Sequence, residues 1–199
     1  MIVGLVLAGG RSSRFGREKA MADLAGRPFI AHVTEVLSTG CERVAINARE
    51  GSLAARYADA HALPCLQDAS NDADGPLAGV KAGLIWAKAQ GAEILATAPC
   101  DTPFLPQDLV GKLFGAGEGG AAVARTSDGL QPLFALWPID ALAVLEAALS
   151  AGEHPSIKLV LKQLNAVEVF FDDPAAFDNL NTPDDYQSAV QRGGARQTS

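Results

Sequence analysis

The first half of the chain alternates short apolar runs with amphipathic helical patterns, and this order limits the folds that it can adopt. Residues 2–7, 43–47 and 94–98 are predicted strands, because each centres on consecutive apolar residues. Residues 28–40 and 77–89 are predicted helices, because their apolar residues recur on one face. Strands that alternate with helices form mostly parallel sheets with helices on both faces. The sequence therefore predicts an α/β fold of three layers, α/β/α, around a mostly parallel sheet.

The second half alternates less regularly. A short strand at 63–66 is also predicted in the first half. The second half is predicted to contain a flexible turn at 115–120, strands at 121–124, 132–137 and 167–171, and helices at 139–150, 156–164 and 183–191. The strands on either side of 127–129 are expected to pair in antiparallel fashion. No internal repeat or long linker divides the chain, so we expect residues 1–192 to form one domain, followed by a polar, disordered tail at 193–199.

Composition and charge exclude several kinds of partner. The chain has 199 residues, of which 48% are hydrophobic and 20% charged, and these values are typical of one folded globular domain. A formal charge of −7 disfavours binding to nucleic acid or to an anionic membrane, since both attract basic surfaces. We therefore expect no nucleic-acid partner and no membrane partner. An anionic ligand would need a local site that overcomes the negative field of the whole chain.

The cysteines and the N-terminus indicate a cytoplasmic protein. Cys41, Cys65 and Cys100 are odd in number and widely spaced, which argues against a disulfide framework and against a zinc cluster. Reduced thiols are the expected state. The apolar run at the N-terminus is too short to span a bilayer and lacks the basic leader of a signal peptide.

The segment after the first predicted strand is a local exception to the acidic composition. It holds a glycine pair and four cationic side chains: Gly9, Gly10, Arg11, Arg14, Arg17 and Lys19. Glycines let the backbone approach a ligand closely, and ligands of open α/β sheets bind beyond the carboxyl ends of the strands. Neither the Walker A nor the GxGxxG spacing is present. The loop therefore predicts a phosphate-binding site of another type, with a solvated basic loop as the alternative.

Polar residues after later strands are further candidates. Asp101 follows the strand at 94–98 and offers a carboxylate suited to Mg²⁺, although a turn-capping role before the next Thr-Pro pair fits equally well. Asn179 and Asn181 would face one side if their segment is extended, although Asn181 also suits a helix N-terminus. The three histidines share no spacing pattern, and we assign them no role.

Five segments together resemble a known family. Residues 7–20, LAGGRSSRFGREKA, look like the signature loop LAGG-x-S-x-R-[MF]-G-x-x-K of nucleotidyltransferases with the nucleotide-diphosphosugar transferase fold. The other matches, in family order, are GPLAG at 75–79, PCDTP at 99–103, QPL at 131–133 and FDNLNTP at 177–183. Within this family the chain most resembles the molybdenum cofactor guanylyltransferases. The resemblance implies a Rossmann-like sheet of the nucleotide-diphosphosugar transferase type.

The resemblance also implies roles for individual residues. It assigns catalysis to Lys19, Arg14 and Asp101, with Asp101 as the ligand of Mg²⁺. It assigns binding of the acceptor to Asn179 and Asn181. It assigns nucleotide binding to Leu7, Ala8, Gly9, Gly10, Arg11, Lys19, Asn47, Asp68, Gly75 and Asp101. Without the resemblance, Asn47 would be interpreted as an ordinary turn residue and Asp68 as an ordinary loop residue.

The reaction that the resemblance implies is transfer of GMP from GTP to the terminal phosphate of molybdopterin or Mo-molybdopterin, with Mg²⁺ as cofactor and release of pyrophosphate. A phosphate monoester has its second pKa at about 6, so the acceptor is largely dianionic at neutral pH and needs no strong general base. GTP and molybdopterin are thus the implied small-molecule substrates. A molybdenum-insertion protein and molybdoenzyme chaperones are the implied protein partners.

Three alternatives stay open at this point. A molybdopterin cytidylyltransferase tends to carry LAAG where this chain has LAGG, so the Gly-Gly pair favours guanine. A sugar-phosphate nucleotidyltransferase usually has a longer chain. A non-catalytic nucleotide-binding delivery module would be expected to lose Lys19 or Asp101, and both are present.

Overall fold

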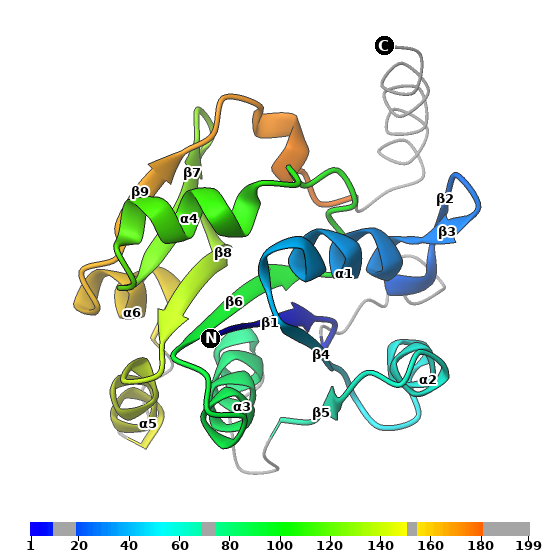
Figure 1. The fold of residues 1–199 in the computed structure, drawn as a ribbon, viewed down its shortest axis with the longest axis horizontal. Helices are drawn as coiled ribbons and strands as arrows, with labels where there is room; N and C mark the ends of the chain where they lie inside the picture. The colour runs from blue at the N-terminus through cyan, green and yellow to red at the C-terminus, as the bar shows by residue number, and fades with distance from the viewer. Residues whose placement is uncertain (10–18, 69–74, 151–154, 181–199) are drawn as a thin grey trace.

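A seven-stranded sheet forms the middle layer of the molecule (Figure 1). The computed structural model describes residues 1–9, 19–68, 75–150 and 155–180. In spatial order the strands are β5 (Cys65–Leu66), β4 (Arg43–Asn47), β1 (Ile2–Leu7), β6 (Ile94–Pro99), β8 (Gly129–Pro138), β7 (Ala122–Thr126) and β9 (Val167–Phe170). The first four are parallel, β8 is antiparallel to both of its neighbours, and β9 is parallel to β7. The sheet therefore has a parallel half and a half built around one antiparallel strand.

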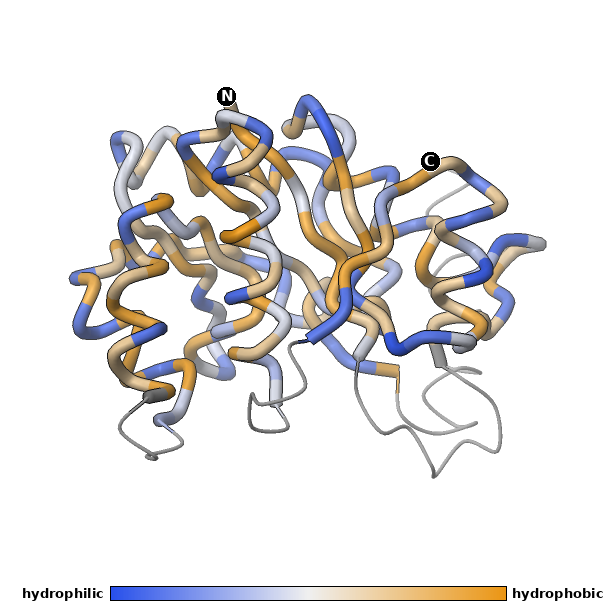
Figure 2. Tube along the Cα trace, turned by 90° about the horizontal axis from the view of Figure 1, so that it is seen from below, coloured by the Kyte–Doolittle hydropathy of each residue, from blue (hydrophilic) through white to orange (hydrophobic). Residues whose placement is uncertain are grey.

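Helices cover both faces of this sheet. One face carries α1 (Phe29–Gly40), α2 (Leu53–Ala60) and α4 (Leu109–Gly117). The other carries α3 (Pro76–Ala89), α5 (Ala141–Ser150) and α6 (Ile157–Gln163). Figure 2 shows hydrophobic and hydrophilic residues alternating along the helices, as amphipathic packing requires. The predicted three-layer α/β/α fold is confirmed. None of the helices in the described part of the chain combines the length and the apolar character needed to cross a membrane.

Strands in the parallel half supply side chains to both cores. In β1, Val3 and Leu5 pack in the core beneath α3, whereas Val6 packs in the core beneath α1. In β6, Leu95 and Ala96 divide in the same way, and all six residues of that strand are buried. Successive side chains of a strand point to opposite faces, so a strand covered on both faces is apolar throughout. This requirement explains the unbroken apolar runs of the sequence.

Thr97 joins the parallel half of the sheet to the antiparallel strand. Thr97 is only 1% exposed. Its hydroxyl donates to the carbonyl oxygen of Leu133 at 2.9 Å and accepts from Nε1 of Trp137 at 3.0 Å. Because the pairing of β6 with β8 ends at Thr97 and Ala135, the hydroxyl continues the connection beyond the backbone ladder. A buried hydroxyl that both donates and accepts fixes the relative position of the two strands.

Most of the predicted elements coincide with the observed ones. The strands predicted at 2–7 and 43–47 are β1 and β4, and the helix predicted at 28–40 is α1 with a start one residue later. The antiparallel pair predicted across 127–129 is confirmed as β7 and β8. The helix and the tail predicted after residue 182 lie outside the described residues.

Several elements were not predicted. They are α2, α4, the hairpin of β2 (Asp23–Leu24) and β3 (Arg27–Pro28), and the 3-10 helices η1 (Lys19–Met21) and η2 (Pro174–Phe177). The turn predicted at 115–120 is wrong at its start, because α4 continues to Gly117. That helix contains three glycines, each of which lowers helix propensity by about 1 kcal/mol. Packing of its apolar residues into the core outweighs this cost, and propensity alone does not reveal it.

Candidate active site

The carboxyl ends of the parallel strands meet at one edge of the sheet. Leu7 of β1 is in register with Asn47 of β4 on one side and with Pro99 of β6 on the other. The amide of Ala8 donates to the carbonyl of Asn47 at 2.8 Å, and the amide of Cys100 donates to that of Leu7 at 3.1 Å. From this edge the chain continues from β1 to α1 on one face and from β5 to α3 on the other. Open α/β sheets bind ligands at such edges, so this is the candidate active site.

On one side of β1, a buried amide holds an exposed carboxylate. Asn47 is 3% exposed, and its Nδ2 donates to Oδ1 of Asp68 at 2.8 Å and to the carbonyl of Leu66 at 3.3 Å. Gly9 lies against this pair: a Cβ at Gly9 would lie 3.1 Å from Oδ1 of Asn47 and 3.7 Å from Oδ2 of Asp68. Asp68 itself is exposed. Its carboxylate is therefore oriented by the protein and still accessible to the hydroxyl or N–H groups of a ligand.

Gly75 begins the helix that packs beside this pair. It is the N-cap of α3, with φ 150° and ψ 169°, a backbone region that is essentially restricted to glycine. Apart from Gly75 itself and its neighbours in the chain, no heavy atom of the described residues lies within 4 Å of the position that a Cβ of Gly75 would occupy. The helix that follows has 14 residues, and its N-terminus carries a partial positive charge. A ligand can therefore approach the backbone at this point closely.

Asp101 lies on the other side of β1, in the turn that follows β6. Oγ1 of Thr102 donates to the carbonyl of Pro99 at 3.0 Å, and Thr102 is fully buried. Asp101 itself is partly buried. The hydroxyl thus closes the turn and fixes the backbone that carries the carboxylate. Thr102 was not predicted, since a threonine before a proline gives no sign of the carbonyl that its hydroxyl will contact.

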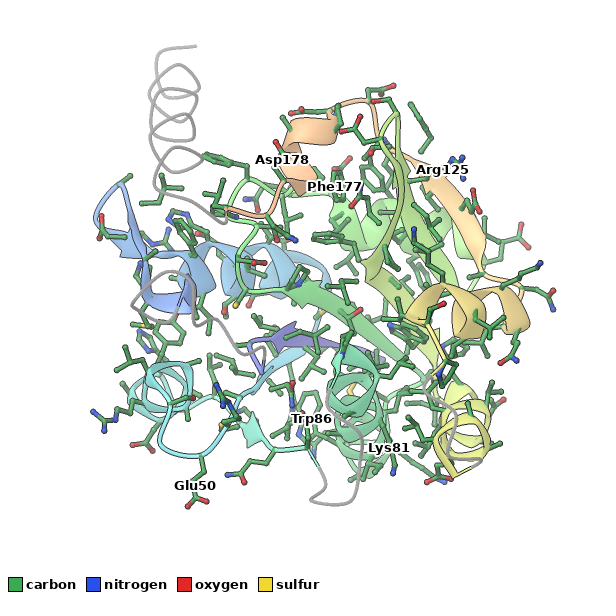
Figure 3. All side chains as sticks on the ribbon, turned by 180° about the vertical axis from the view of Figure 1, so that it is seen from behind. Glu50, Lys81, Trp86, Arg125, Phe177 and Asp178 are labelled. Atoms are coloured by element: carbon green, nitrogen blue, oxygen red, sulfur yellow. The ribbon has the colours of Figure 1, made fainter. Side chains whose placement is uncertain are left out.

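The segment after η2 lies against the same turn. The amide of Leu180 donates to the carbonyl oxygen of Asp101 at 3.0 Å. Asn179 is exposed, whereas Phe177 and Leu180 on either side of it are 4% and 1% exposed. Figure 3 shows Phe177 and Asp178 together at the end of η2. Two buried anchors therefore hold an exposed asparagine next to Asp101, although the two are far apart in the sequence.

Comparison with known proteins identifies the family of this chain. The family model of the MobA-like NTP transferase domain matches residues 4–167. The chain belongs to this family. Its curated relatives include molybdenum cofactor guanylyltransferases of Cereibacter sphaeroides, 43% identical over 94% of this chain and 95% of that protein, and of Rhodobacter capsulatus, 40% identical over 96% of each. The relative of the same name from Cupriavidus necator is 40% identical over 96% of this chain and 97% of its own length.

Solved structures agree on the fold of this MobA-like NTP transferase domain. Molybdopterin-guanine dinucleotide biosynthesis protein A of Archaeoglobus fulgidus is similar with a TM-score of 0.74 and 24% identity, over 98% of this chain and 100% of that chain. The 4-diphosphocytidyl-2C-methyl-D-erythritol synthase of Anaerococcus prevotii also has a TM-score of 0.74, with 12% identity, over 98% of this chain and 96% of that chain. The family and the fold type that the sequence motifs implied are thus confirmed.

The structure describes part of the predicted site. Around β1 it brings together Leu7, Ala8, Gly9, Asn47, Asp68 and Asp101, with Gly75 at the helix beside Asn47 and Asn179 at the turn of Asp101. Lys19 begins η1. The other predicted residues, Gly10, Arg11, Arg14 and Asn181, lie outside the described residues. The roles of all these residues stay predictions.

The donors near Asp101 suit a magnesium ion. Mg²⁺ prefers oxygen ligands and usually takes one or two protein carboxylates together with substrate phosphates and water. Asp101 offers one carboxylate at the end of a strand, and Asp178 and Asn179 belong to the segment that is hydrogen-bonded to it. In the described ranges, no three His, Cys, Asp or Glu side chains form a cluster that could hold a metal ion.

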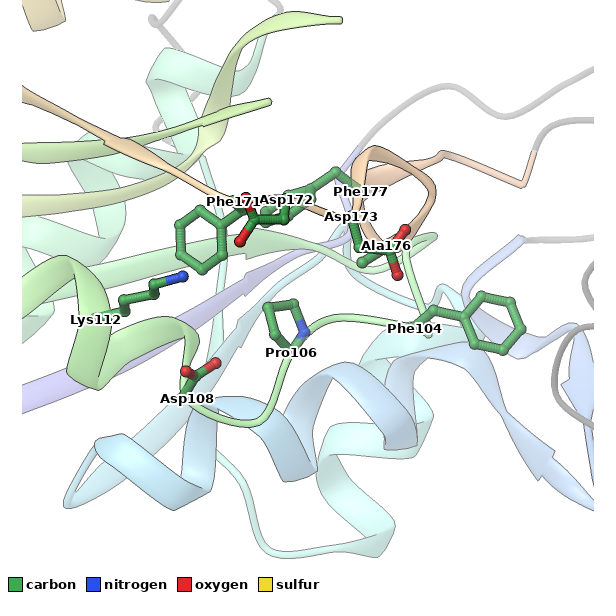
Figure 4. Close-up of a pocket in the computed structure, with 9 residues that line it drawn as sticks. All are labelled: Phe104, Pro106, Asp108, Lys112, Phe171, Asp172, Asp173, Ala176 and Phe177. Carbon is green, nitrogen blue, oxygen red and sulfur yellow. The ribbon is translucent and has the colours of Figure 1, made fainter. Parts of the chain in front are cut away.

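A separate pocket of about 230 Å³ lies between α4 and the segment that leads into η2 (Figure 4). Its lining residues are Phe104, Pro106, Asp108, Lys112, Phe171, Asp172, Asp173, Ala176 and Phe177. Nζ of Lys112 lies 4.7 Å from the centre of the Phe171 ring, so this cation already interacts with an aromatic face. The volume is below the range of about 300–1,000 Å³ that is usual for ligand sites. We assign no ligand to this pocket.

Proposed function

We propose that this chain transfers GMP from GTP to the terminal phosphate of molybdopterin and releases pyrophosphate. One observation carries the proposal: an oriented carboxylate and an exposed glycine backbone lie on one side of β1, and a second carboxylate lies on the other. The family membership and the names of the relatives support the same reaction. We expect the reaction to take place in the cytoplasm, in a single domain of residues 1–192.

The nucleotide side of the site comprises Gly9, Asn47, Asp68 and Gly75. The Asp68 carboxylate is an acceptor for ribose hydroxyls or for the N–H groups of guanine, and Asn47 holds it in place from behind. The backbone at Gly75 is open to a planar base, because the residue has no side chain. Its φ and ψ angles lie in a region that only glycine adopts readily, so the conformation itself requires a residue without a side chain. These features support binding of the nucleoside part of GTP here.

The phosphates of GTP would extend from this side toward Asp101. Asp101 would hold Mg²⁺, which when bound neutralises charge on the triphosphate. Lys19, Arg11 and Arg14 are the cations that would hold the triphosphate from the glycine-rich loop, with Lys19 beside the phosphoryl group that is transferred. The main catalytic contribution would be alignment of the attacking oxygen with the α-phosphorus, together with charge neutralisation.

The acceptor side of the site comprises the segment with Asn179, which is hydrogen-bonded to the turn of Asp101, and Asn181 would belong to it. Its asparagine amides would orient the terminal phosphate of molybdopterin. An oxygen of that phosphate forms a bond to the α-phosphorus of GTP, and the bond from this phosphorus to the bridging oxygen of pyrophosphate breaks. The attacking oxygen carries no proton at neutral pH in the dianion, so no side chain needs to remove one. The proposed protein partners of this reaction are a molybdenum-insertion protein and molybdoenzyme chaperones.

The test is turnover with each nucleotide. The purified chain is incubated with molybdopterin, Mg²⁺ and GTP, ATP, CTP or UTP, and release of pyrophosphate is measured together with transfer of the labelled nucleoside monophosphate. The proposal expects turnover with GTP and little with CTP. Preferred turnover with CTP would identify a cytidylyltransferase instead. Binding of GTP without turnover would identify a delivery module.

A further inference from the structure

Gly79 in α3 lies directly against the side chain of Asn47. A Cβ at Gly79 would lie 2.5 Å from Oδ1 and 3.0 Å from Cγ of Asn47, and 3.0 Å from Cδ2 of Leu7. The first distance is far below van der Waals contact, so a side chain at this position forces a neighbour to move. The tip of Leu7 can yield by rotating, since it is the end of a flexible side chain. The amide of Asn47 is the neighbour that matters.

Asn47 has no room to yield. A Cβ at Gly9 would also lie 3.1 Å from the same Oδ1, so glycines from two different segments, the one after β1 and α3, lie against this oxygen. Its Nδ2 is committed to Asp68 at 2.8 Å and to the carbonyl of Leu66 at 3.3 Å. The residue is 3% exposed. Any displacement of the amide therefore breaks the hydrogen bond that orients the Asp68 carboxylate.

We infer that Gly79 is a positioning residue of the nucleotide site, acting through Asn47 on Asp68. It lets the first turns of α3 close on the amide, so that Asn47 is clamped between α3 and the loop after β1. The clamp holds the carboxylate in the one orientation in which it can accept from the nucleoside. The inference rests on the proposed nucleotide site.

Gly83 provides a matched control one turn further along the same helix. Like Gly79 it is buried, and a Cβ there would lie 2.5 Å from Cδ2 of Leu5 and 2.8 Å from Cδ2 of Leu95. The clash is as severe as at Gly79, but it falls on apolar core side chains and not on Asn47. Gly83→Ala therefore reports the cost of overpacking α3 against the sheet without moving the amide.

The experiment compares Gly79→Ala, Gly83→Ala and the unchanged chain by melting temperature and by KM for GTP and kcat with molybdopterin. Both variants are expected to melt at a lower temperature. Only Gly79→Ala is expected to raise KM for GTP, by about tenfold, because an oriented hydrogen-bonding group is lost. KM for molybdopterin should stay unchanged. An equal KM for GTP in the two variants would overturn the inference, whatever their melting temperatures.

A double substitution separates displacement of the amide from general damage. In an Asn47→Ala background no amide remains to be displaced, so adding Gly79→Ala should leave KM for GTP within about twofold of the single variant. If the two changes multiply instead, Gly79 does not act through Asn47 and the inference fails. An unchanged chain that neither binds nor turns over GTP would overturn the proposed function and the inference together. Normal turnover with indistinguishable Gly79 and Gly83 variants would overturn the inference alone.

Discussion

The nucleotide side and the acceptor side of the site are built by different means. On the nucleotide side, strand ends in parallel register bring together residues that follow different strands, and a buried amide orients an exposed carboxylate. Two glycines without side chains, Gly9 and Gly79, leave space for that amide. The geometry there depends on small residues and on hydrogen bonds. Substitutions should consequently alter binding of the nucleotide before they alter the fold.

On the acceptor side, the packing of apolar side chains fixes the position of the polar residues. Phe177 contacts Phe134 of β8 and Phe171 edge to face, with ring centres 5.0 and 5.1 Å apart. Leu180, at the other end of the segment, is buried with Leu24 and Phe29. The exposed Asn179 lies between these two buried residues, and they determine its position. Substitutions on this side should therefore couple stability to use of the acceptor.

The largest expected effect is at Asp101, where the two sides meet. Asp101→Ala should lower kcat by about 10²–10³-fold, since the carboxylate proposed to hold Mg²⁺ is lost while the backbone carbonyl that contacts Leu180 is kept. The measurement is release of pyrophosphate at saturating GTP. Asp108→Ala, at an exposed carboxylate before α4 that makes no capping bond, is the control and should leave kcat unchanged. Near-normal turnover of Asp101→Ala would refute the metal assignment.

A smaller effect, confined to the nucleotide, is expected at Asp68. Asp68→Asn keeps the shape of the side chain but replaces one acceptor oxygen by a donor, so KM for GTP should rise by about tenfold. KM for molybdopterin and the melting temperature should change little, because Asp68 is exposed. Asp59→Asn, on the exposed surface of α2, removes the same charge elsewhere and serves as the control. Equal loss of affinity for both substrates would contradict the separation of the two sides.

The parallel half of the fold could be predicted from the sequence, whereas much of the rest could not. β1 and β6 are covered on both faces, and that condition leaves an unbroken apolar run in the sequence. By contrast, α2 buries only the small side chains of Ala54 and Ala58, so no run of large apolar residues marks it in the sequence. α4 contains three glycines, which lower its helix propensity, and it is stabilised by burial of Leu109, Val110 and Leu113. Contacts that decide such elements are made by residues distant in sequence.

The candidate site shows the same division. Asp101 follows a recognisable strand, so its place at the sheet edge could be predicted. Asn47 and Asp68 look like turn and loop residues in isolation, and only the fold shows that one holds the other. Gly79 belongs to the GPLAG segment, but the sequence analysis singled out only Gly75 of that segment as a site residue. The role of Gly79 is the space that it leaves for the amide of Asn47 on β4, and only the fold shows this.

A moderate effect that joins stability to the acceptor is expected at Phe177. Phe177→Leu should lower the free energy of unfolding by about 1–2 kcal/mol, since the side chain is 4% exposed and makes two aromatic contacts. KM for molybdopterin should rise a few-fold at a temperature where the variant is folded, and KM for GTP should not. Phe114→Leu, at a 42% exposed position of α4, should change neither quantity. A pure loss of stability with both KM values unchanged would show that Asn179 is not positioned by this anchor.

The last expected effect is absent at neutral pH and tests how tightly the core is packed around Cys41, which precedes β4 at the end of the sheet opposite the site. Burial raises the pKa of the Cys41 thiol from 9.0 to about 12, and its Sγ lies 3.3 Å from where a Cβ of Gly4 in β1 would be. In the unfolded chain this thiol ionises at its ordinary pKa, so between pH 9 and 12 the unfolded state binds fewer protons and stability falls as pH rises. The slope from this group is at most about 1.4 kcal/mol per pH unit, and below pH 8 it vanishes. Denaturant unfolding of Cys41→Ala should therefore show a shallower decline than the unchanged chain above pH 9, with parallel curves at lower pH. Parallel curves over the whole range would mean that water reaches this thiol, and that the core around it is packed less tightly than its burial indicates.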